Sequence, residues 1–191
     1  MTSHLNITAL VHEKLQSSLA PASCAIDATA GNGHDAVFIS QTLGADGQLH
    51  LIDCQESALR ATRERMNDQS STPHTHYHLG NHGAVLEQLC KTHQGKVAAC
   101  IFNLGYLPGG DKTITTTQSN TLRALEATST LLAPGGILSI VCYPGHPEGA
   151  AEAAAVSAWA EKQKAANLYK LEAYQNTGTM RPGPYLLWLV K

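Results

Sequence analysis

Cys24-Ala-Ile-Asp27-Ala-Thr-Ala-Gly31-Asn-Gly33-His-Asp35 is the stretch of the sequence that decides the fold. It is typical of a short apolar strand, a glycine turn and the start of a helix. Glycine is needed in such a turn where φ is positive or where a side chain would block a ligand. A ligand can then approach the backbone N–H groups at the helix N-terminus. The stretch predicts a cofactor site, although an ordinary tight turn has the same glycine pattern.

Strand-like and helical segments alternate along the rest of the chain. Strands are predicted at 24–27, 48–53, 74–79, 97–102, 137–142, 168–175 and 185–190, and helices at 7–19, 35–43, 55–66, 82–92, 117–132 and 150–164. Strands separated by helices pair in parallel, whereas the last two strands, joined by a loop alone, predict an antiparallel hairpin. We expect one α/β domain over residues 1–191, with a Rossmann-like, seven-stranded, mostly parallel, doubly wound sheet.

Composition and charge narrow the class of protein. The chain has 191 residues, of which 43% are hydrophobic and 15% charged, so it is globular. Its five cysteines include no C-x-x-C pair and predict small buried side chains in a reducing compartment. With no signal core and no run of membrane-spanning length, we expect a cytoplasmic protein without a membrane partner. The net charge of −2 is unusual for a nucleic-acid enzyme.

Asp53, at the end of the second predicted strand, makes the cofactor prediction more specific. Asp53 follows Gly33 by 20 residues, where a carboxylate can reach a ribose diol. Dinucleotide-binding folds share this spacing, and NAD remains an alternative. Two features favour S-adenosylmethionine (SAM): position 36 is alanine instead of a third glycine, and Asp27 would face a cationic ligand but repel a pyrophosphate. The candidate cofactor-binding residues are Asp27, Ala28, Gly31, Asn32, Gly33, His34, Asp35, Asp53, Gln55, Asn81, His82 and Asn103.

Asn81 and His82 follow the third predicted strand, where residues flank an adenine in such folds. A structural turn is an equal alternative at this position. The histidines at 74, 76 and 78 alternate along the third strand and suggest a metal site. No carboxylate or cysteine joins them nearby in the sequence. A polar sheet face is the preferred interpretation, and no metal is expected.

The fourth predicted strand leads into Phe102-Asn103-Leu-Gly-Tyr106-Leu-Pro-Gly-Gly-Asp111, at a strand end where ligands bind in doubly wound folds. Asn103-x-x-Tyr106 resembles the Asn/Asp-Pro-Pro-Tyr motif of amino-directed methyltransferases. In that motif the amide oxygen accepts a hydrogen bond from the target amine, and the ring packs against the acceptor. Leu104 and Gly105 replace both prolines here. The alternative is that Asn103 forms a turn and Tyr106 belongs to the core.

A second loop, Tyr143-Pro-Gly-His146-Pro-Glu-Gly149, follows the fifth predicted strand. It either closes over the acceptor with His146 pointing inward or is a rigid loop with a solvated histidine. An amine acceptor must lose a proton before it attacks, and Asp111, His34 and His146 are the candidate bases. The candidate catalytic residues are Asn103, Tyr106, Asp111 and His146.

Three segments carry a family resemblance that runs over nearly the whole chain. Asp27–Asp35, Phe102–Asp111 and Val141–Gly149 resemble, in the same order, the small bacterial family known as rRNA methylases. Members of that family are similar to the enzyme that methylates 5-aminomethyl-2-thiouridine at the wobble position of tRNA. The resemblance implies a class I SAM-dependent methyltransferase with a Rossmann-like fold. One departure is Arg181-Pro-Gly-Pro-Tyr185, where the family pattern is richer in asparagine.

The resemblance also implies a partner, the anticodon stem-loop of tRNA. A local patch of Lys112, Arg123 and Arg181, or a homodimer, would supply the positive charge that the chain as a whole lacks. Methylation of rRNA, methylation of a small-molecule amine and SAM binding without catalysis remain alternatives. The candidate substrate or RNA contacts are Gly105, Pro108, Gly109, Lys112, Tyr143 and Arg181.

Overall fold

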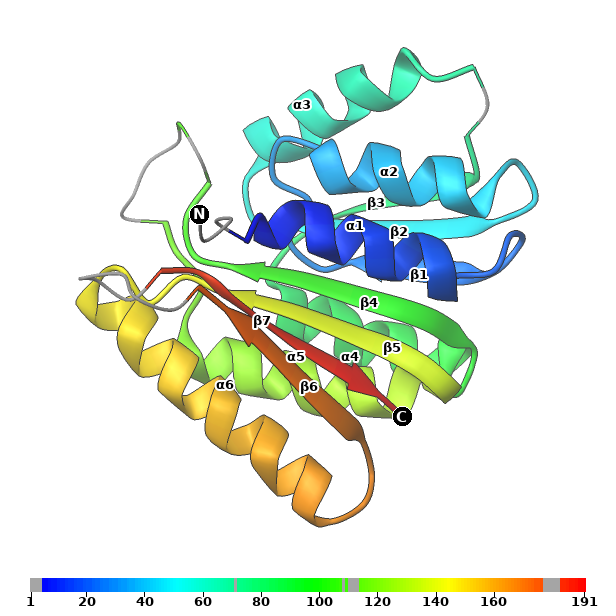
Figure 1. Cartoon of the computed structure of the whole chain (residues 1–191). Helices are drawn as coiled ribbons and strands as arrows, with labels where there is room; N and C mark the ends of the chain where they lie inside the picture. Colours follow the sequence, from blue (N-terminus) through cyan, green and yellow to red (C-terminus); the bar gives the residue numbers. More distant parts are fainter. Residues whose placement is uncertain (1–4, 71, 108, 110–113, 177–182) are drawn as a thin grey trace.

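A computed structural model describes residues 5–70, 72–107, 109, 114–176 and 183–191. These residues form a seven-stranded sheet with helices on both faces (Figure 1). The strands are β1 (Cys24–Asp27), β2 (Gln48–Asp53), β3 (His74–Leu79), β4 (Val97–Leu104), β5 (Leu132–Cys142), β6 (Lys170–Gln175) and β7 (Tyr185–Val190). The helices are α1 (Ile7–Ser18), α2 (His34–Leu43), α3 (Glu56–Asn67), α4 (His82–His93), α5 (Gln118–Leu131) and α6 (Pro147–Ala165).

The strand order is β3-β2-β1-β4-β5-β7-β6. The first five strands of this order pair in parallel, and β7 runs antiparallel to both of its neighbours. In Figure 1 the arrowheads of β4 and β5 therefore point to the left, whereas that of β7 points to the right. The predicted fold is confirmed. The order reverses between β1 and β4, which is where a doubly wound sheet binds ligands.

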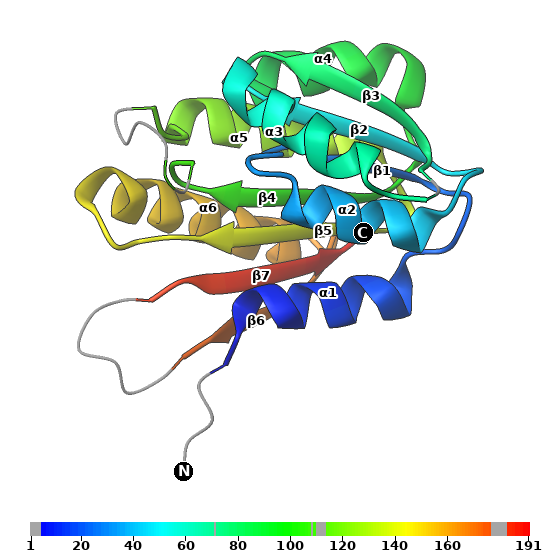
Figure 2. The ribbon, with the colours of Figure 1, turned by 90° about the horizontal axis from the view of Figure 1, so that it is seen from above.

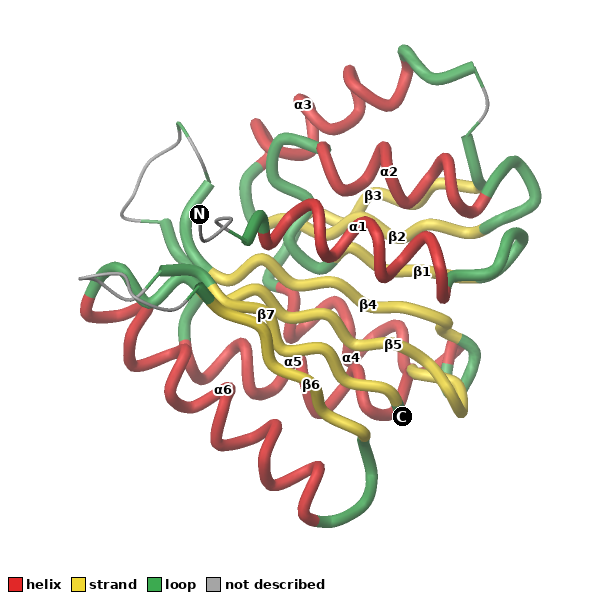
Figure 3. Tube along the Cα trace, in the orientation of Figure 1, coloured by secondary structure: helices red, strands yellow, loops and turns green. Residues whose placement is uncertain are grey.

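Two hydrophobic cores lie on opposite faces of the sheet, because successive side chains of a strand point to opposite sides. Leu49 and Ile101 pack with α1, α2 and α3 on one face. Ile52 and Phe102 pack with α4, α5 and α6 on the other. Figures 2 and 3 show the resulting three layers. Within the described residues, no helix is both long and apolar enough to cross a bilayer.

Helix α1 packs against the strands that come last in the sequence. Lys14 Nζ donates to Glu172 Oε2 at 2.7 Å and lies 5.0 Å from the centre of the Trp188 ring. The Asn176 amide exchanges two hydrogen bonds with the backbone of Leu5. The N-terminal helix is therefore fastened to β6 and β7 (Figure 2).

Two element boundaries differ from the predictions by three residues or more. Strand β5 begins at Leu132, five residues before the predicted start at 137, and so includes Pro134–Gly136. A register shift against Val97 and Ala99 of β4 forms a bulge there. A bulge accommodates proline and the positive φ of Gly135 (77°). Helix α6 begins at Pro147, three residues before the predicted start, because proline is favoured in the first turn of a helix.

Candidate functional site

A cleft of about 910 Å³ opens at the carboxyl ends of the parallel strands. Loops that follow β1 to β5 contribute its walls, so the cleft lies across the reversal in strand order. Its lining includes Ala28, Thr29, Gly31, Asp53, Cys54, Gln55, Gly80, Asn81, His82, Asn103, Gly105, Tyr106, Leu107, Tyr143, Pro144, Gly145 and His146. Eleven of these residues are candidate cofactor, substrate or catalytic residues of the sequence-based prediction.

The turn after β1 needs both of its glycines. Gly31 and Gly33 have φ values of 54° and 80°. A Cβ atom on Gly33 would lie 2.8 Å from the Cα atom of Thr62 in α3. The Thr62 hydroxyl donates to the carbonyl oxygen of Gly31 at 2.9 Å, and Arg65 Nε donates to that of Asn32 at 2.9 Å. Helix α3 therefore fixes the shape of the turn.

Asp53 joins two walls of the cleft. Its Oδ2 accepts a hydrogen bond from the Gly31 N–H and its Oδ1 accepts one from the Gln55 N–H, both at 2.9 Å. Each carboxylate oxygen has two lone pairs, so each can also accept from a ligand hydroxyl. The arrangement fits a ribose diol lying against the backbone of the glycine turn.

Asp27 was expected to face a cationic ligand, but the structure places its side chain in the protein interior. It is fully buried and is not among the described residues that line the cleft. Its Oδ1 accepts from the Thr29 N–H at 3.1 Å, whereas Oδ2 has no partner among the described residues. Burial, and then the nearby Asp35 carboxylate, raise the pKa of Asp27 well above its usual value. The raised pKa favours the neutral form of a carboxyl whose hydrogen bond to Thr29 supports the turn.

A chain of hydrogen bonds orients Asn103. Its backbone N–H donates to the Thr29 hydroxyl at 2.7 Å, and its Nδ2 donates to Asp35 Oδ2 at 2.8 Å. Asp35 Oδ1 accepts in turn from His12 Nε2 at 2.6 Å, and the His12 ring stacks on Phe38. Because the amide is planar, fixing Nδ2 also fixes the direction of Oδ1. These hydrogen bonds hold Asn103, which lines the cleft, in one orientation.

Asp35 holds its charge although it is largely enclosed. Burial raises its pKa, but hydrogen bonds from His12 and Asn103 outweigh burial, and the net pKa is lowered. Asp35 was predicted to bind the cofactor, but it is not among the described lining residues, and its two oxygens are used by His12 and Asn103. Neither His12 nor Thr29 was among the candidates: Thr29 lies inside the glycine-turn stretch but was not singled out, and His12 lies in no recognisable motif.

Asn81 and His82 line the cleft at the start of α4, and each has a structural partner there. Asn81 caps the helix, with its Oδ1 accepting from the Gly83 N–H at 2.9 Å. His82 Nε2 lies 3.4 Å from the Thr121 hydroxyl, which donates to Glu152 Oε1 at 2.6 Å. The sequence analysis also missed the buried Glu152.

We predict that His82 makes stability depend on pH. Burial, opposed by a backbone hydrogen bond with Ala28, lowers the pKa of His82 from 6.5 to about 4. The folded state therefore favours the neutral ring, and its stabilising contribution is complete above pH 6.5 and lost as the pH falls toward 4. From about pH 7.5 to about pH 5 the contribution falls by about 2 kcal/mol. Urea unfolding at both pH values should show a smaller loss for His82→Gln than for wild type.

The exposed His74 provides the matched control for this experiment. A His74→Gln variant should lose stability between the two pH values as the wild type does. An identical loss in His82→Gln and wild type would show that His82 titrates in the folded protein as it does in the unfolded chain.

Two tyrosines and a histidine border the cleft beyond Asn103. Tyr106 and Tyr143 are 41% and 40% exposed, and the centre of the Tyr106 ring lies 5.9 Å from that of His146. His146 caps α6 through its Nδ1, which accepts from the Gly149 N–H at 3.1 Å. In the neutral ring the proton is then on Nε2, so His146 is a donor in this arrangement. A role as general base would require it to give up the cap.

The remaining predicted residues fall into two groups. Pro108, Asp111, Lys112 and Arg181 lie outside the described residues. Asn32, Gly33 and His34 shape the glycine turn and the start of α2, and neither they nor the exposed Gly109 appear in the described lining. The proposed RNA contact Arg123 forms a bidentate ion pair with Glu87, at 2.7 and 3.1 Å, which offsets much of its charge.

Comparison with protein families gives the class of this site. A family described as "Putative rRNA methylase" matches residues 49–189. The chain belongs to this family. The match begins in β2 and ends in β7, so it includes Asp53, Asn103 and the Tyr143 loop. The resemblance proposed from three sequence motifs is confirmed.

Relatives and solved structures agree with this class. The chain is 32% identical over 164 residues to the chloroplastic tRNA (mnm5s2U34)-methyltransferase of Arabidopsis thaliana, covering 80% of this chain and 58% of the relative's length. A structure from Clostridium thermocellum, described as "putative rRNA-methylase", superposes with a TM-score of 0.89 at 27% identity, covering 99% of both chains. A "putative methyltransferase" of Streptococcus mutans in complex with SAH gives 0.84 at 30% identity, covering 98% of both. The prediction of a SAM-dependent methyltransferase is confirmed.

Proposed function

We propose that this methyltransferase transfers a methyl group from SAM to the 5-aminomethyl nitrogen of the wobble (2-thio)uridine in tRNA, in the cytoplasm. The relative from Arabidopsis thaliana, named for this position of tRNA, supports the choice of acceptor. Because the chain spans 58% of that relative's length, the acceptor does not follow from the match alone. It rests on the chemistry of the cleft.

The observation that carries the proposal is the placement of Asn103. Its amide is held by Asp35 and lines the same cleft as Gly31 and Asp53. An oriented amide oxygen accepts a hydrogen bond from an N–H and so selects an amine and aims its lone pair. Methyl transfer from a sulfonium is an in-line displacement, in which such positioning supplies much of the rate.

The exposed rings of Tyr106 and Tyr143 support a nucleobase as the body of the acceptor. Single-stranded RNA is recognised by stacking its splayed bases on aromatic side chains. Both rings line the cleft next to Asn103, and each presents about two fifths of its surface to solvent. A wobble base lies in an unpaired loop and can be turned out of its stack. The arrangement therefore suits a base with an aminomethyl arm.

The family's name favours rRNA as a second candidate acceptor, and the net charge of −2 favours a small-molecule amine as a third. The three candidates differ in how they depend on salt. A stem-loop that contacts several phosphates binds more weakly as salt rises, with a log–log slope of several units. A small amine without phosphates has almost no such slope.

A direct comparison of acceptors tests the proposal. Purified enzyme with methyl-labelled SAM is offered aminomethyl-bearing tRNA, unmodified tRNA, rRNA and simple primary amines. We expect label only in the aminomethyl-bearing tRNA, recovered as the methylaminomethyl nucleoside by mass spectrometry. Tyr106→Ala and Tyr143→Ala should raise the KM for tRNA about tenfold or more, since stacking contributes about 1–3 kcal/mol per base.

Leu168 supplies the control, because it is 57% exposed and is not among the residues that line the cleft. Leu168→Ala should have the wild-type KM. Label in rRNA alone, or in a simple amine at a rate that salt does not change, would contradict the tRNA assignment.

A further inference from the structure

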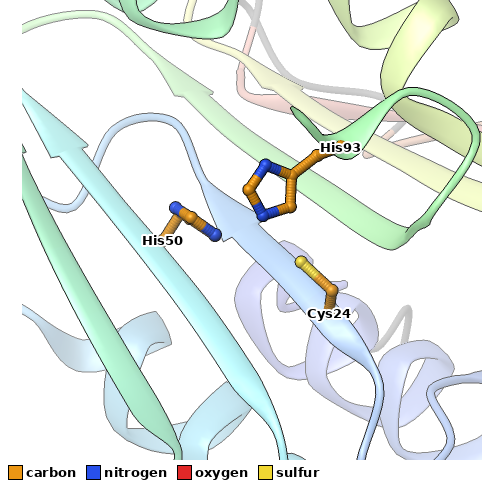
Figure 4. Close-up of side chains that lie close together, drawn as sticks. All are labelled: Cys24, His50 and His93. Atoms are coloured by element: carbon orange, nitrogen blue, oxygen red, sulfur yellow. The ribbon is translucent and has the colours of Figure 1, made fainter. Parts of the chain in front are cut away.

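Three side chains with metal-ligating atoms converge away from the cleft. Cys24 lies at the start of β1, His50 in the middle of β2 and His93 at the end of α4. Figure 4 shows the thiol and the two rings turned toward a common point between these elements. One potential ligand atom of each residue lies within 4.8 Å of those of the other two. The cleft, by contrast, is at the opposite ends of these strands.

His50 has a buried nitrogen without a partner. The residue is 3% exposed, and its Nε2 has no hydrogen-bond partner among the described residues. Its Nδ1 lies 3.0 Å from His78 Nε2. When Nδ1–H donates to His78, the lone pair of His50 is on Nε2. A buried polar atom without a partner costs free energy, and a bound cation would satisfy this lone pair.

The two nitrogens of the His93 ring divide in the same way between a hydrogen bond and the common point. His93 Nδ1 lies 2.7 Å from the Thr92 hydroxyl, which leaves Nε2 to face the common point. A histidine that binds a metal usually has its other ring nitrogen hydrogen-bonded, because that bond fixes both tautomer and orientation. His50 and His93 both meet this condition, through His78 and Thr92.

Metal binding at such a site is coupled to the protonation of its ligands. Burial, followed by the neighbouring histidines, lowers the pKa of His50 from 6.5 to about 3, so its ring is neutral at pH 7. Burial raises the pKa of the Cys24 thiol to about 11. The thiol therefore stays protonated until a cation displaces the proton, and metal binding here releases one proton from Cys24.

We infer that Cys24, His50 and His93 bind a zinc ion, with water in the fourth position. One thiolate and two imidazoles are the ligands that Zn²⁺ prefers, and they do not suit Mg²⁺ or Ca²⁺. Zn–S bonds of about 2.3 Å and Zn–N bonds of about 2.0 Å require the ligand atoms to approach by small side-chain rotations. The ion would clamp β1, β2 and the end of α4 together.

This site departs from the sequence-based expectation of no metal. That expectation rested on His74, His76 and His78, which have no cysteine nearby in the sequence. The fold instead places Cys24 and His93 beside His50, which lies on β2, the strand next to β3. His78 then supports a ligand through its hydrogen bond to His50 and is not itself one of the three converging groups.

Metal titration of the tag-free protein tests the inference without an activity assay. We expect one Zn²⁺ per chain by calorimetry and a higher Tm with Zn²⁺ present. With Co²⁺ as the probe, we expect a thiolate-to-cobalt charge-transfer band in the near ultraviolet. Cys24→Ser should abolish this band, His93→Gln should weaken Zn²⁺ binding by more than 100-fold, and His78→Ala should weaken it by about 10–100-fold.

Cys90→Ser and His74→Gln are the matched controls. The Cys90 thiol contacts the Ala127 carbonyl oxygen of α5, and His74 is exposed. Both variants should bind Zn²⁺ as the wild type does. Circular dichroism without metal checks that each variant is folded. Absence of the cobalt band in wild type, or equal Zn²⁺ affinity in Cys24→Ser, His93→Gln and the controls, would overturn the zinc site.

Discussion

Asn103→Ala is expected to bind SAM within about threefold of wild type and to turn over about 100-fold more slowly. In the proposed function the amide positions the acceptor, whereas Gly31 and Asp53 bind the methyl donor. A loss of 100-fold corresponds to about 3 kcal/mol of transition-state stabilisation. Calorimetry with SAM and single-turnover kinetics with aminomethyl-bearing tRNA measure the two quantities separately.

Two further variants separate positioning from general damage. His12→Phe keeps a ring that can stack on Phe38 but removes the donor to Asp35 Oδ1. It should lower turnover less than Asn103→Ala and leave KM nearly unchanged, because His12 acts through Asp35. Asn67→Ala, at the exposed end of α3, should behave as wild type. Parallel losses of SAM affinity and turnover in Asn103→Ala would show that the amide only maintains the loop.

Asp53→Ala is expected to weaken SAM binding by about 100-fold or more. The substitution removes the acceptor for a ribose diol and also the two hydrogen bonds that hold the Gly31 and Gln55 backbones together. Hydrogen bonds to a charged group are worth about 1.5–3 kcal/mol each. Calorimetry with SAM and SAH measures the effect.

Asp53→Asn distinguishes the two contributions. Its amide retains one acceptor oxygen and replaces the other with a donor, which would face a backbone N–H. We expect an affinity between those of wild type and Asp53→Ala. The control is Asp46→Ala, which replaces an exposed acid in the turn before β2 and should bind SAM with wild-type affinity. Wild-type affinity in Asp53→Ala, or tighter binding of NADH than of SAM, would refute the assignment of Asp53.

The sequence was sufficient for the fold because each element carries its own local signal. The mostly apolar segment Leu49–Ile52, the apolar run Ala98–Phe102 and the glycine turn after β1 are readable without tertiary information. The bounds of β5 and α6 were harder to predict, because proline and glycine resemble terminators there. A bulge against β4 accommodates Pro134, and the first helical turn accommodates Pro147. Both outcomes depend on the environment of the residue and not on the residue itself.

The candidate site was predictable only where its residues lie in motifs. Gly31 lies in the turn after β1, Asp53 ends β2 and Asn103 lies near the end of β4. The strand ends bring the three residues to one cleft. His12 and Glu152 reach their partners from other elements, through hydrogen bonds across long separations in sequence. Nothing in the local pattern around either residue reports such a contact. Asp27 is the opposite case. Its position next to the glycine turn is readable from the sequence, but its complete burial is not.

The packing of α1 on β6 and β7 has a consequence for the order in which the protein matures. Lys14 and Glu172 are 158 residues apart, so the partners of α1 are synthesised long after it. Until β6 and β7 have been synthesised, α1 cannot pack against them. His12, carried by α1, contacts Phe38 and Asp35 of α2, and we expect its final position to be set when α1 docks on β6 and β7. We therefore expect the glycine turn to form early and the hydrogen bonds that orient Asn103 to be completed late in folding.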